Sequence, residues 1–324
     1  MKYLVIDDEN QLYKIMYSDI FKTEKYDVEE IEKFNTMPSW MKLINRIHFN
    51  DRIGRHCKVP FKNIWNSRYT LSSYNFDKNE QYWIIFLNGT IRNYYTKRYL
   101  LQLKERNDNI KLAMIMYDSF SNRSAARAVS FIPVFDVVLS FDREDCNQHG
   151  LEHIYGTFSS PDFLYKDSSY YSSAFFIGSG DSRLTLMQRV FHSICKYVEN
   201  CKFYIVGVKP RYRKYTDDIS YTETIEYDKV LMYSYNTNCI VEVLKPGQTG
   251  ISLRTCEAMA FNKKLLTNNT SLKDMPFYDE RYMKIYSNED DIDYKFITAK
   301  CEVHYKQSDL FSPLHILERL ESIS

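Results

Sequence analysis

The feature that most constrains the fold is a repeated alternation, along the whole chain, of short apolar runs with longer amphipathic segments. The short runs are rich in β-branched and aromatic residues, and small or polar residues follow them. This alternation is typical of βα units on a parallel sheet. We therefore predict strands at residues 3–6, 83–87, 112–116 and 137–141 in the first half, and at 174–177, 203–206, 239–243, 264–267 and 283–285 in the second.

Helices are predicted between these strands from apolar residues that recur with a helical period. In residues 184–197 five side chains form one such stripe: Leu184, Met187, Val190, Phe191 and Ile194. Further helices are expected at residues 96–106, 227–233, 252–261 and 314–320.

The length of 324 residues is about twice that of a usual single domain. A Ser- and Tyr-rich stretch at residues 159–173 separates the two series of βα units and is predicted to be a linker. We expect an α/β protein with two Rossmann-like domains, residues 1–160 and 161–324, facing across a cleft, with the final helix in the second domain or packed back on the first. Ligands should then lie at the carboxyl ends of the strands. The alternative is two such domains without a catalytic cleft.

Charge and residue usage exclude several classes of protein. The 43 Lys and Arg against 42 Asp and Glu leave a formal charge of +1, so we expect no nucleic-acid partner. The seven Cys form no CxxC pair and the seven His show no metal-ligand spacing, so we predict reduced thiols, no bound metal and no cofactor. Because there is no signal-peptide core and no apolar run near the roughly 18 residues of a membrane span, we expect a cytoplasmic protein.

The most informative segment is residues 239–269, with the sequence CIVEVLKPGQTGISLRTCEAMAFNKKLLTNN. Gly247 and Gly250 allow backbone to approach a ligand, and the free N–H groups at the start of the following helix favour a phosphate. Arg254 adds a planar donor in the first turn, and Glu257 lies on the same side of the helix, where it can accept from a ribose diol. The alternative for this pair is a surface ion pair worth a few tenths of a kcal/mol.

This segment resembles the GT-B glycosyltransferases, and more closely the bacterial capsule and lipopolysaccharide enzymes with the pattern Q-S-G-L-T-x-R-x-x-E, then K-K-L-I-T-x-N, then F-Y. The matching residues here are Gln248-Thr249-Gly250-Ile251-Ser252-Leu253-Arg254 with Glu257, then Lys263-Lys264-Leu265-Leu266-Thr267-Asn268-Asn269, then Phe277-Tyr278. The resemblance covers about forty residues.

The resemblance implies a hexosyltransferase-type enzyme that moves a sugar from a nucleotide-sugar donor to a surface-polysaccharide or lipid-linked glycan acceptor. It assigns donor binding to Gln248, Thr249, Gly250, Ser252, Arg254 and Glu257, with Glu257 on the ribose and Ser252 and Arg254 on the diphosphate. Two departures from the pattern matter. Thr249 stands where many retaining enzymes have a second Glu, and Asn262 replaces the usual Gly, so inversion is favoured over retention.

The loop after the predicted strand 174–177 is a second candidate part of the donor-binding site. Gly178 and Arg183 are predicted donor-binding residues, because Arg183 can bring positive charge to the leaving diphosphate. The alternative is an ordinary strand-to-helix turn in which Asp181 or Ser182 caps the helix.

On the acceptor side, the predicted strands of the first domain end at polar residues, and an inverting transfer needs a base there. Asp118 is the first candidate because it follows a fully apolar run; the alternative is that it caps the following turn. Asp142 and Asp145 are interpreted as helix caps.

A cationic, aromatic loop at residues 209–215 is a candidate for peripheral contact with anionic lipid at the inner face of the membrane, or else a solvated loop. Two other functions stay open. One is different nucleotide-sugar chemistry on the same fold, as in an epimerase or pyruvyl transferase, and the other is a non-catalytic nucleotide-binding partner subunit.

Overall fold

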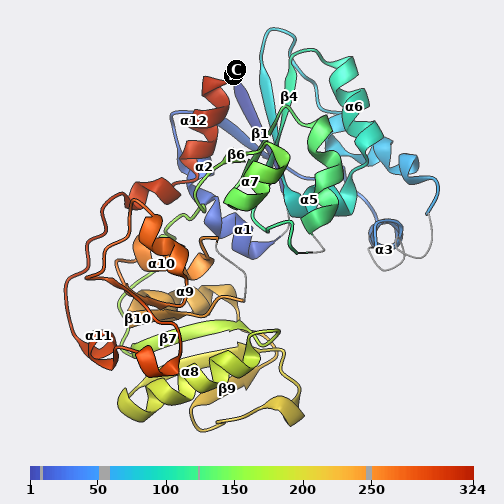
Figure 1. The fold of residues 1–324 in the computed structure, drawn as a ribbon. Helices are drawn as coiled ribbons and strands as arrows, with labels where there is room; N and C mark the ends of the chain where they lie inside the picture. The colour runs from blue at the N-terminus through green and yellow to red at the C-terminus, as the bar shows by residue number, and fades with distance from the viewer. Residues whose placement is uncertain (8–9, 51–58, 123–124, 246–249) are drawn as a thin grey trace. The chain divides into compact units, whose positions relative to one another are not determined.

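The computed structural model describes residues 1–7, 10–50, 59–122, 125–245 and 250–324 (Figure 1). The chain divides into two compact units, Met1–Tyr155 with Pro313–Ser324, and Gly156–Ser312. Each unit contains a six-stranded parallel sheet with helices on both faces. The predicted α/β class with two Rossmann-like domains is therefore confirmed. The stretch 159–173 lies within the second unit.

The first unit is built on a sheet with strand order β2-β1-β3-β4-β5-β6. Its elements, with η for 3-10 helices, are β1 (Lys2–Ile6), α1 (Gln11–Met16), α2 (Ser18–Lys22), β2 (Asp27–Ile31), α3 (Ser39–His48), η1 (Lys62–Arg68), η2 (Thr70–Ser72), β3 (Tyr82–Leu87), α5 (Asn88–Tyr94), α6 (Lys97–Arg106), β4 (Ile110–Met116), η3 (Ala125–Val134), β5 (Val137–Ser140), α7 (Arg143–His149), β6 (Glu152–His153) and α12 (Leu314–Ser322). Side chains alternate across the strands, so that Ile84 and Phe86 pack under α5 and α6.

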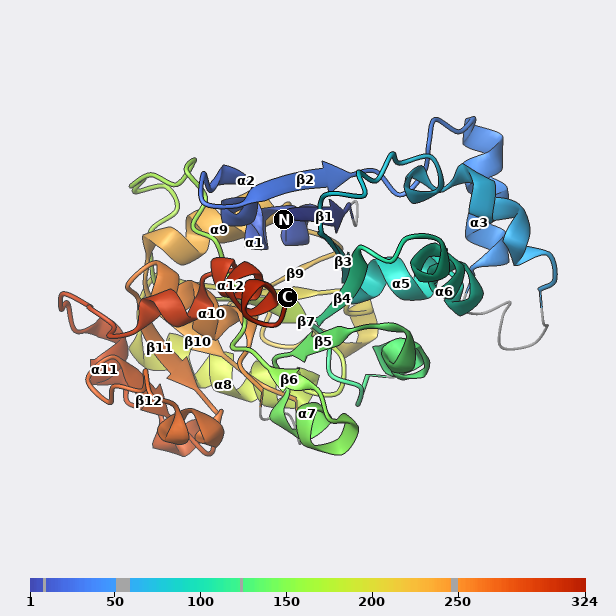
Figure 2. The same ribbon diagram turned by 90° about the horizontal axis from the view of Figure 1, so that it is seen from above.

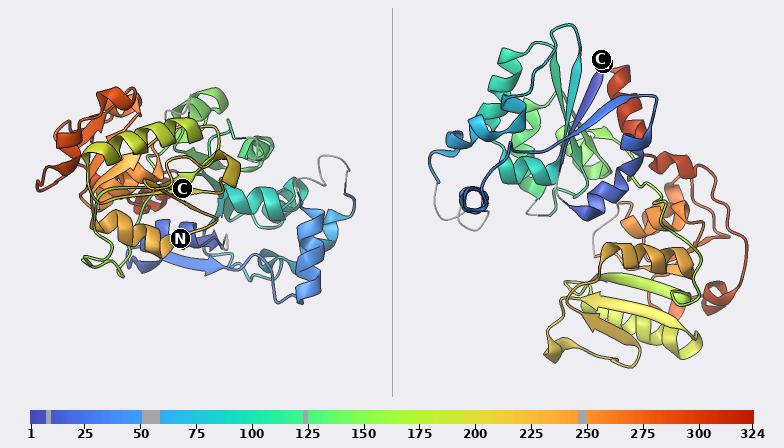
Figure 3. Two further views of the ribbon diagram at one scale, coloured as in Figure 1. Left: turned by 90° about the horizontal axis from the view of Figure 1, so that it is seen from below. Right: turned by 180° about the vertical axis from the view of Figure 1, so that it is seen from behind.

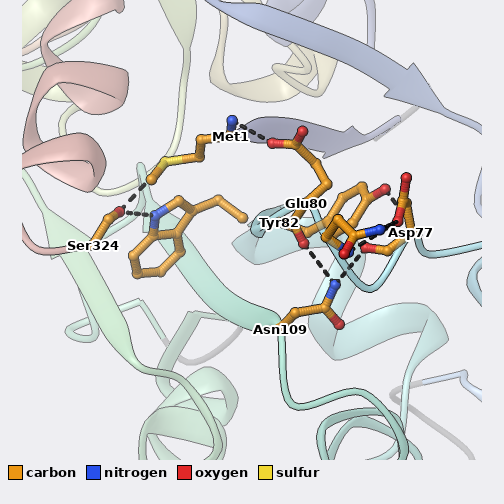
Figure 4. Close-up of polar contacts among 8 residues, drawn as sticks. Met1, Asp77, Glu80, Tyr82, Asn109 and Ser324 are labelled. Carbon is orange, nitrogen blue, oxygen red and sulfur yellow. Dashed lines mark hydrogen bonds and ion pairs between the residues drawn. The ribbon is translucent and has the colours of Figure 1, made fainter.

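The last helix, α12, lies on the other face of this first sheet. The indole Nε1 of Trp83 donates to Ser324 Oγ over 2.7 Å, and Lys111 Nζ donates to the carbonyl of Ile323 over 3.0 Å. Figure 4 shows Ser324 beside Met1, and also Asn109, whose amide donates to the carbonyls of Asp77 and Glu80 over 2.8 and 2.6 Å. These bonds fasten α12 and the turn before β3 to the first unit.

The second unit has the strand order β12-β11-β10-β7-β8-β9. Its elements are β7 (Ser172–Ser179), α8 (Leu184–Tyr197), β8 (Cys201–Val206), η4 (Pro210–Tyr212), β9 (Ile219–Thr222), α9 (Tyr227–Asn236), β10 (Thr237–Glu242), α10 (Leu253–Ala260), β11 (Lys264–Thr267), η5 (Thr270–Asp274), β12 (Met283–Ile285), η6 (Glu289–Asp291), α11 (Tyr294–Thr298) and η7 (Ser308–Phe311). Phe176 packs against α8, whereas its neighbour Phe175 stacks on Tyr233 of α9, so opposite faces of the sheet are covered (Figures 1 and 3).

All nine predicted strands are present, and α8 has the predicted limits. Three strands were not predicted: β2, β6 and β9. Each lies at an edge of its sheet, where one side of the strand is unpaired, and none contains a continuous apolar run. No helix within the described ranges is long and apolar enough to cross a bilayer.

Candidate functional site

The topology of the second sheet indicates where a ligand should bind. Its strands follow the order 3-2-1-4-5-6 of dinucleotide-binding domains, with the order reversing between the first strand, β7, and the fourth, β10. Ligands of open α/β sheets bind beyond the carboxyl ends of the strands at this switch point. Gly178 lies near the end of β7, which extends two residues beyond the predicted strand, and the segments that follow β7 and β10 contain Arg183, Ser252 and Arg254; all four are predicted donor-binding residues.

The start of α10 is anchored by a carboxylate that the sequence analysis did not single out, Glu242. Ser252 is the N-cap of α10: its Oγ accepts from the backbone N–H of Arg254 over 3.0 Å and donates to Glu242. The buried carboxylate of Glu242 also accepts from Thr255 Oγ1 over 2.9 Å and from Thr267 Oγ1. Three hydroxyl donors satisfy this carboxylate and hold the amide end of α10 against the end of β10. Its signal in the sequence is a Glu at the end of the apolar run 239–241.

Arg254 and Glu257 lie on the same side of α10, as predicted. Arg254 Nη1 is 2.5 Å from Glu257 Oε2, and Glu257 also accepts from Ser234 Oγ over 2.6 Å and from Tyr227 over 3.3 Å. Burial raises the pKa of Glu257, while Arg254 and the two hydroxyls act against that rise. The ion pair of the alternative interpretation is present, but it is buried, and the ribose contact of Glu257 stays a prediction.

Arg183 lies at the carboxyl end of β7, with its guanidinium over the ring of Phe176, 5.7 Å from the ring centre. Its Nη1 donates to the carbonyl of Val243 at the end of β10. Its Nε is buried and has no hydrogen-bond partner among the described residues. Burial lowers the pKa of Arg183, and the positive charge of Arg254 adds to this effect, whereas Asp181 and Glu242 oppose it. The two arginines therefore lie close enough for their charges to interact.

The guanidinium of Arg183 can take this position only because residue 178 is a glycine. A Cβ at residue 178 would lie 2.9 Å from Arg183 Nη2 and 2.7 Å from Phe176 Cζ, both closer than side-chain packing allows. The guanidinium thus occupies the space that a side chain at residue 178 would fill.

Neither Asp181 nor Ser182 caps α8, so this part of the alternative interpretation is wrong. The N-cap residue of α8 is Arg183 itself, and no side chain caps this helix. Asp181 instead forms an ion pair with Lys245, with Nζ and Oδ2 2.6 Å apart, which links the segments after β7 and β10. Of the remaining predicted donor residues, Gly250 accepts through its carbonyl from Asn269 Nδ2 over 3.2 Å, and Gln248 and Thr249 lie outside the described residues.

Asp118, the candidate base, lies in the first unit, just beyond the end of β4. It is half-buried, and its neighbour Tyr117 packs on Tyr13 of α1 with ring centres 3.7 Å apart. The order of this sheet reverses between β1 and β3, so Asp7 at the end of β1 lies nearer the switch point. Asp7 is buried and pairs with Lys14 over 3.3 Å.

Asp142 is the N-cap residue of α7, as predicted, but the prediction that Asp145 is a helix cap is wrong, because Asp145 lies within α7 and its carboxylate binds the segment after β4. Asp142 Oδ1 accepts from the backbone N–H groups of Glu144 and Asp145 over 2.9 and 3.2 Å at the start of α7. Asp145 accepts from the N–H of Phe120 over 2.7 Å. This second bond fixes the segment after β4 that contains Asp118.

Two other residues of the segment that resembles the glycosyltransferases, Lys264 and Asn262, have structural roles. The ammonium of Lys264 is buried and donates to the carbonyls of Phe296, Ile297 and Ala299, which ties β11 to α11. Asn262 has φ of 51°, the left-handed conformation that glycine adopts most easily and that Asn tolerates. The usual Gly of the pattern is thus replaced by the residue best suited to the same backbone.

Solved structures with the same architecture include a putative UDP-N-acetylglucosamine 2-epimerase from Listeria monocytogenes, with a TM-score of 0.54, 10% identity and coverage of 99% of this chain and 96% of that one. MnaA of S. aureus in complex with UDP matches with a TM-score of 0.50, 9% identity and coverage of 99% and 96%. The chain has the GT-B fold. TarM is matched with a TM-score of 0.46 and 13% identity over 79% of this chain, which spans 58% of TarM's length. No protein-family model matches the sequence, and no curated protein matches it significantly.

Proposed function

We propose that this protein is a glycosyltransferase that moves a sugar from a nucleotide-sugar donor to a surface-polysaccharide or lipid-linked glycan acceptor, without a metal ion. The observation that carries the proposal is Arg183. Its buried Nε lacks a partner among the described residues, at the switch point of a Rossmann-like sheet and within electrostatic range of Arg254. A buried guanidinium with an unused N–H is suited to an anion, and the diphosphate of a sugar nucleotide is the anion that such a position binds.

In this proposal the donor diphosphate is bound by Arg183, Arg254 and the backbone N–H groups at the start of α10, and by the family resemblance Gln248, Thr249 and Gly250 also contact the donor. These groups stabilise the negative charge that develops on the leaving diphosphate, so that catalysis is mostly positioning and electrostatics. Glu257 orients Arg254 through their ion pair and, by the family resemblance, contacts the ribose. Asp118 is the proposed base of an inverting transfer.

The test is calorimetric titration with UDP and UDP-sugars, because UDP is bound in the MnaA structure. Arg183→Ala should weaken nucleotide binding at least about tenfold, since a charge-assisted hydrogen bond is lost. The matched control is Arg281→Ala, because Arg281 is an exposed arginine of the same unit that pairs with Asp279. Equal affinities for the wild type and Arg183→Ala would refute the donor site.

A second candidate is a sugar-nucleotide epimerase, favoured by the similarity to the Listeria protein. Product analysis separates the two, because an epimerase or pyruvyl transferase yields a modified sugar nucleotide and no new glycosidic bond. A non-catalytic partner subunit would bind nucleotide without turnover, and Asp118→Asn would then leave the activity of its complex unchanged. For the transferase we propose a cytoplasmic location at the inner face of the membrane, where lipid-linked acceptors lie.

A further inference from the structure

Helix α3 of the first unit exposes a continuous apolar stripe. Trp40, Leu43, Ile44 and Ile47 follow one another at i, i+3, i+4 and i+7, and are 63%, 60%, 38% and 46% exposed. This spacing puts the four side chains on one side of the helix. In a soluble protein such a stripe normally faces the core, so its exposure indicates an interaction surface.

The neighbouring 3-10 helix η1 extends this surface. Phe61 and Ile64 are 72% and 51% exposed. The middle of η1 packs on the end of α3: the indole N–H of Trp65 donates to His48 Nδ1 over 3.0 Å, with the two rings edge to face. Figure 2 shows α3 at one side of the first unit, away from β4 and β5. We call the six exposed apolar residues of α3 and η1 the α3 surface.

Positive charge is concentrated in the same part of the chain. Residues 34–76 contain seven Lys and Arg and a single acidic residue, Asp51, whereas the whole chain has a formal charge of only +1. Two of these cations, Lys42 and Arg46, lie on α3 itself and line a cavity of about 320 Å³ together with Asn45, Tyr94 and one acidic residue, Glu32. The helix therefore has one apolar side and one basic side.

We propose that the α3 surface binds the surface of an anionic phospholipid bilayer. An exposed apolar stripe that includes Trp, next to Lys and Arg, is the arrangement by which helices lie in the bilayer interface, with apolar side chains among the acyl chains and cations at the phosphates. Nucleic acid would be attracted by the cations but offers nothing to cover Leu43, Ile44 and Ile47. A symmetric contact with a second copy would bring two strongly basic segments together.

The loop at residues 209–215 is less suited to this role. Its two tyrosines are already in contact with polar groups: the guanidinium of Arg211 lies over the ring of Tyr212 at 4.7 Å, and Tyr215 stacks on His192 with ring centres 4.0 Å apart. The loop therefore presents cations without an apolar stripe. The proposal for α3 is independent of sugar transfer, because it needs neither donor nor acceptor.

The experiment uses the full chain and vesicles of phosphatidylglycerol or phosphatidylcholine. The protein should co-sediment with the anionic vesicles, and less so as salt increases. Trp40 reports on contact directly, because the other two tryptophans, Trp65 and Trp83, are each only 2% exposed. Its fluorescence should shift to the blue with anionic vesicles, and Trp40→Phe should bind with that shift abolished.

Two variants decide between the outcomes. Leu43→Ser/Ile47→Ser should weaken vesicle binding at least tenfold, and the control Leu101→Ser, on a leucine of α6 that is 45% exposed, should bind as the wild type does. Both should keep the wild-type unfolding temperature, because all the substituted side chains are exposed. Equal binding by the double variant, or no blue shift, would overturn the proposal. So would RNA binding without vesicle binding, or a dimer that only the double variant disrupts.

Discussion

Arg254 and Glu257 form an ion pair across one turn of α10, with Nη1 and Oε2 2.5 Å apart and side chains that are only 11% and 0% exposed. Ser234 and Tyr227 of α9 donate to the same carboxylate, so the pair also joins α10 to α9. An exposed pair at this spacing is worth a few tenths of a kcal/mol. A buried pair is different, because removing one partner leaves a charge without compensation.

Glu257→Ala should lower the free energy of unfolding by about 3–5 kcal/mol, because Arg254 would stay buried without its partner. Urea unfolding measures this change. The control is the double variant Arg254→Ala/Glu257→Ala, which should be destabilised by clearly less than the sum of the two single variants. Additive single effects would show that the pair is not coupled.

Lys263 should make stability depend on pH. Burial, together with the nearby charge of Lys166, lowers the pKa of Lys263 from 10.5 to about 7. Between these pH values the unfolded chain holds a proton that the folded chain lacks, so the free energy of unfolding should rise with pH, by at most about 1.4 kcal/mol per pH unit.

The measurement is urea unfolding of wild type and Lys263→Met between pH 7 and 9.5. The difference in unfolding free energy between the two proteins should change with pH in the stated direction, whereas Lys196→Met, on an exposed lysine of α8, should leave the slope unchanged. A pH-independent difference for Lys263→Met would contradict the lowered pKa.

Gly178→Ala should disturb the donor site more than the fold. The added methyl group would meet Arg183 Nη2 and Phe176 Cζ, and the guanidinium is the part that can move. We expect UDP affinity to fall about tenfold or more, with a stability loss of about 1–3 kcal/mol from overpacking. Calorimetry and urea unfolding measure the two effects, with Ser179→Ala as the control. Unchanged UDP affinity in Gly178→Ala would show that the position of Arg183 does not matter for binding.

Substitutions of Asn262 can test the left-handed backbone conformation at the end of α10. The N–H of Lys263 donates to the carbonyl of Ala258 over 2.8 Å, which closes the helix around the left-handed Asn262. Asn262→Gly should be neutral or stabilising, and Asn262→Ala should cost about 1 kcal/mol, because a Cβ is disfavoured at positive φ. Thermal unfolding compares the two, and the opposite ranking would be inconsistent with the left-handed conformation.

Much of the fold could be predicted because central strands are covered on both faces and therefore appear as apolar runs. Edge strands are paired on one side only and need not be apolar. The sequence of β2, DVEEI, has two adjacent glutamates because one side of that strand is not paired. Helix α3 was not among the predicted helices, although its apolar residues have a helical spacing; that spacing by itself indicates a buried face, and the structure exposes it.

By itself the sequence determined the fold class, the limits of α8 and the helical segment with Arg254 and Glu257, because these depend on residues within a few positions of one another. Only the tertiary structure decided that Arg183 meets Val243 and that Glu242 anchors Ser252 and Thr267. Arg183 meets Val243 because β10 pairs with β7 and not with β9, the strand before it in sequence, and Glu242 meets Thr267 because the two are partners in the pairing of β10 with β11. The order of the strands in a sheet depends on which surfaces are buried across the whole sheet, and no short stretch of sequence specifies it.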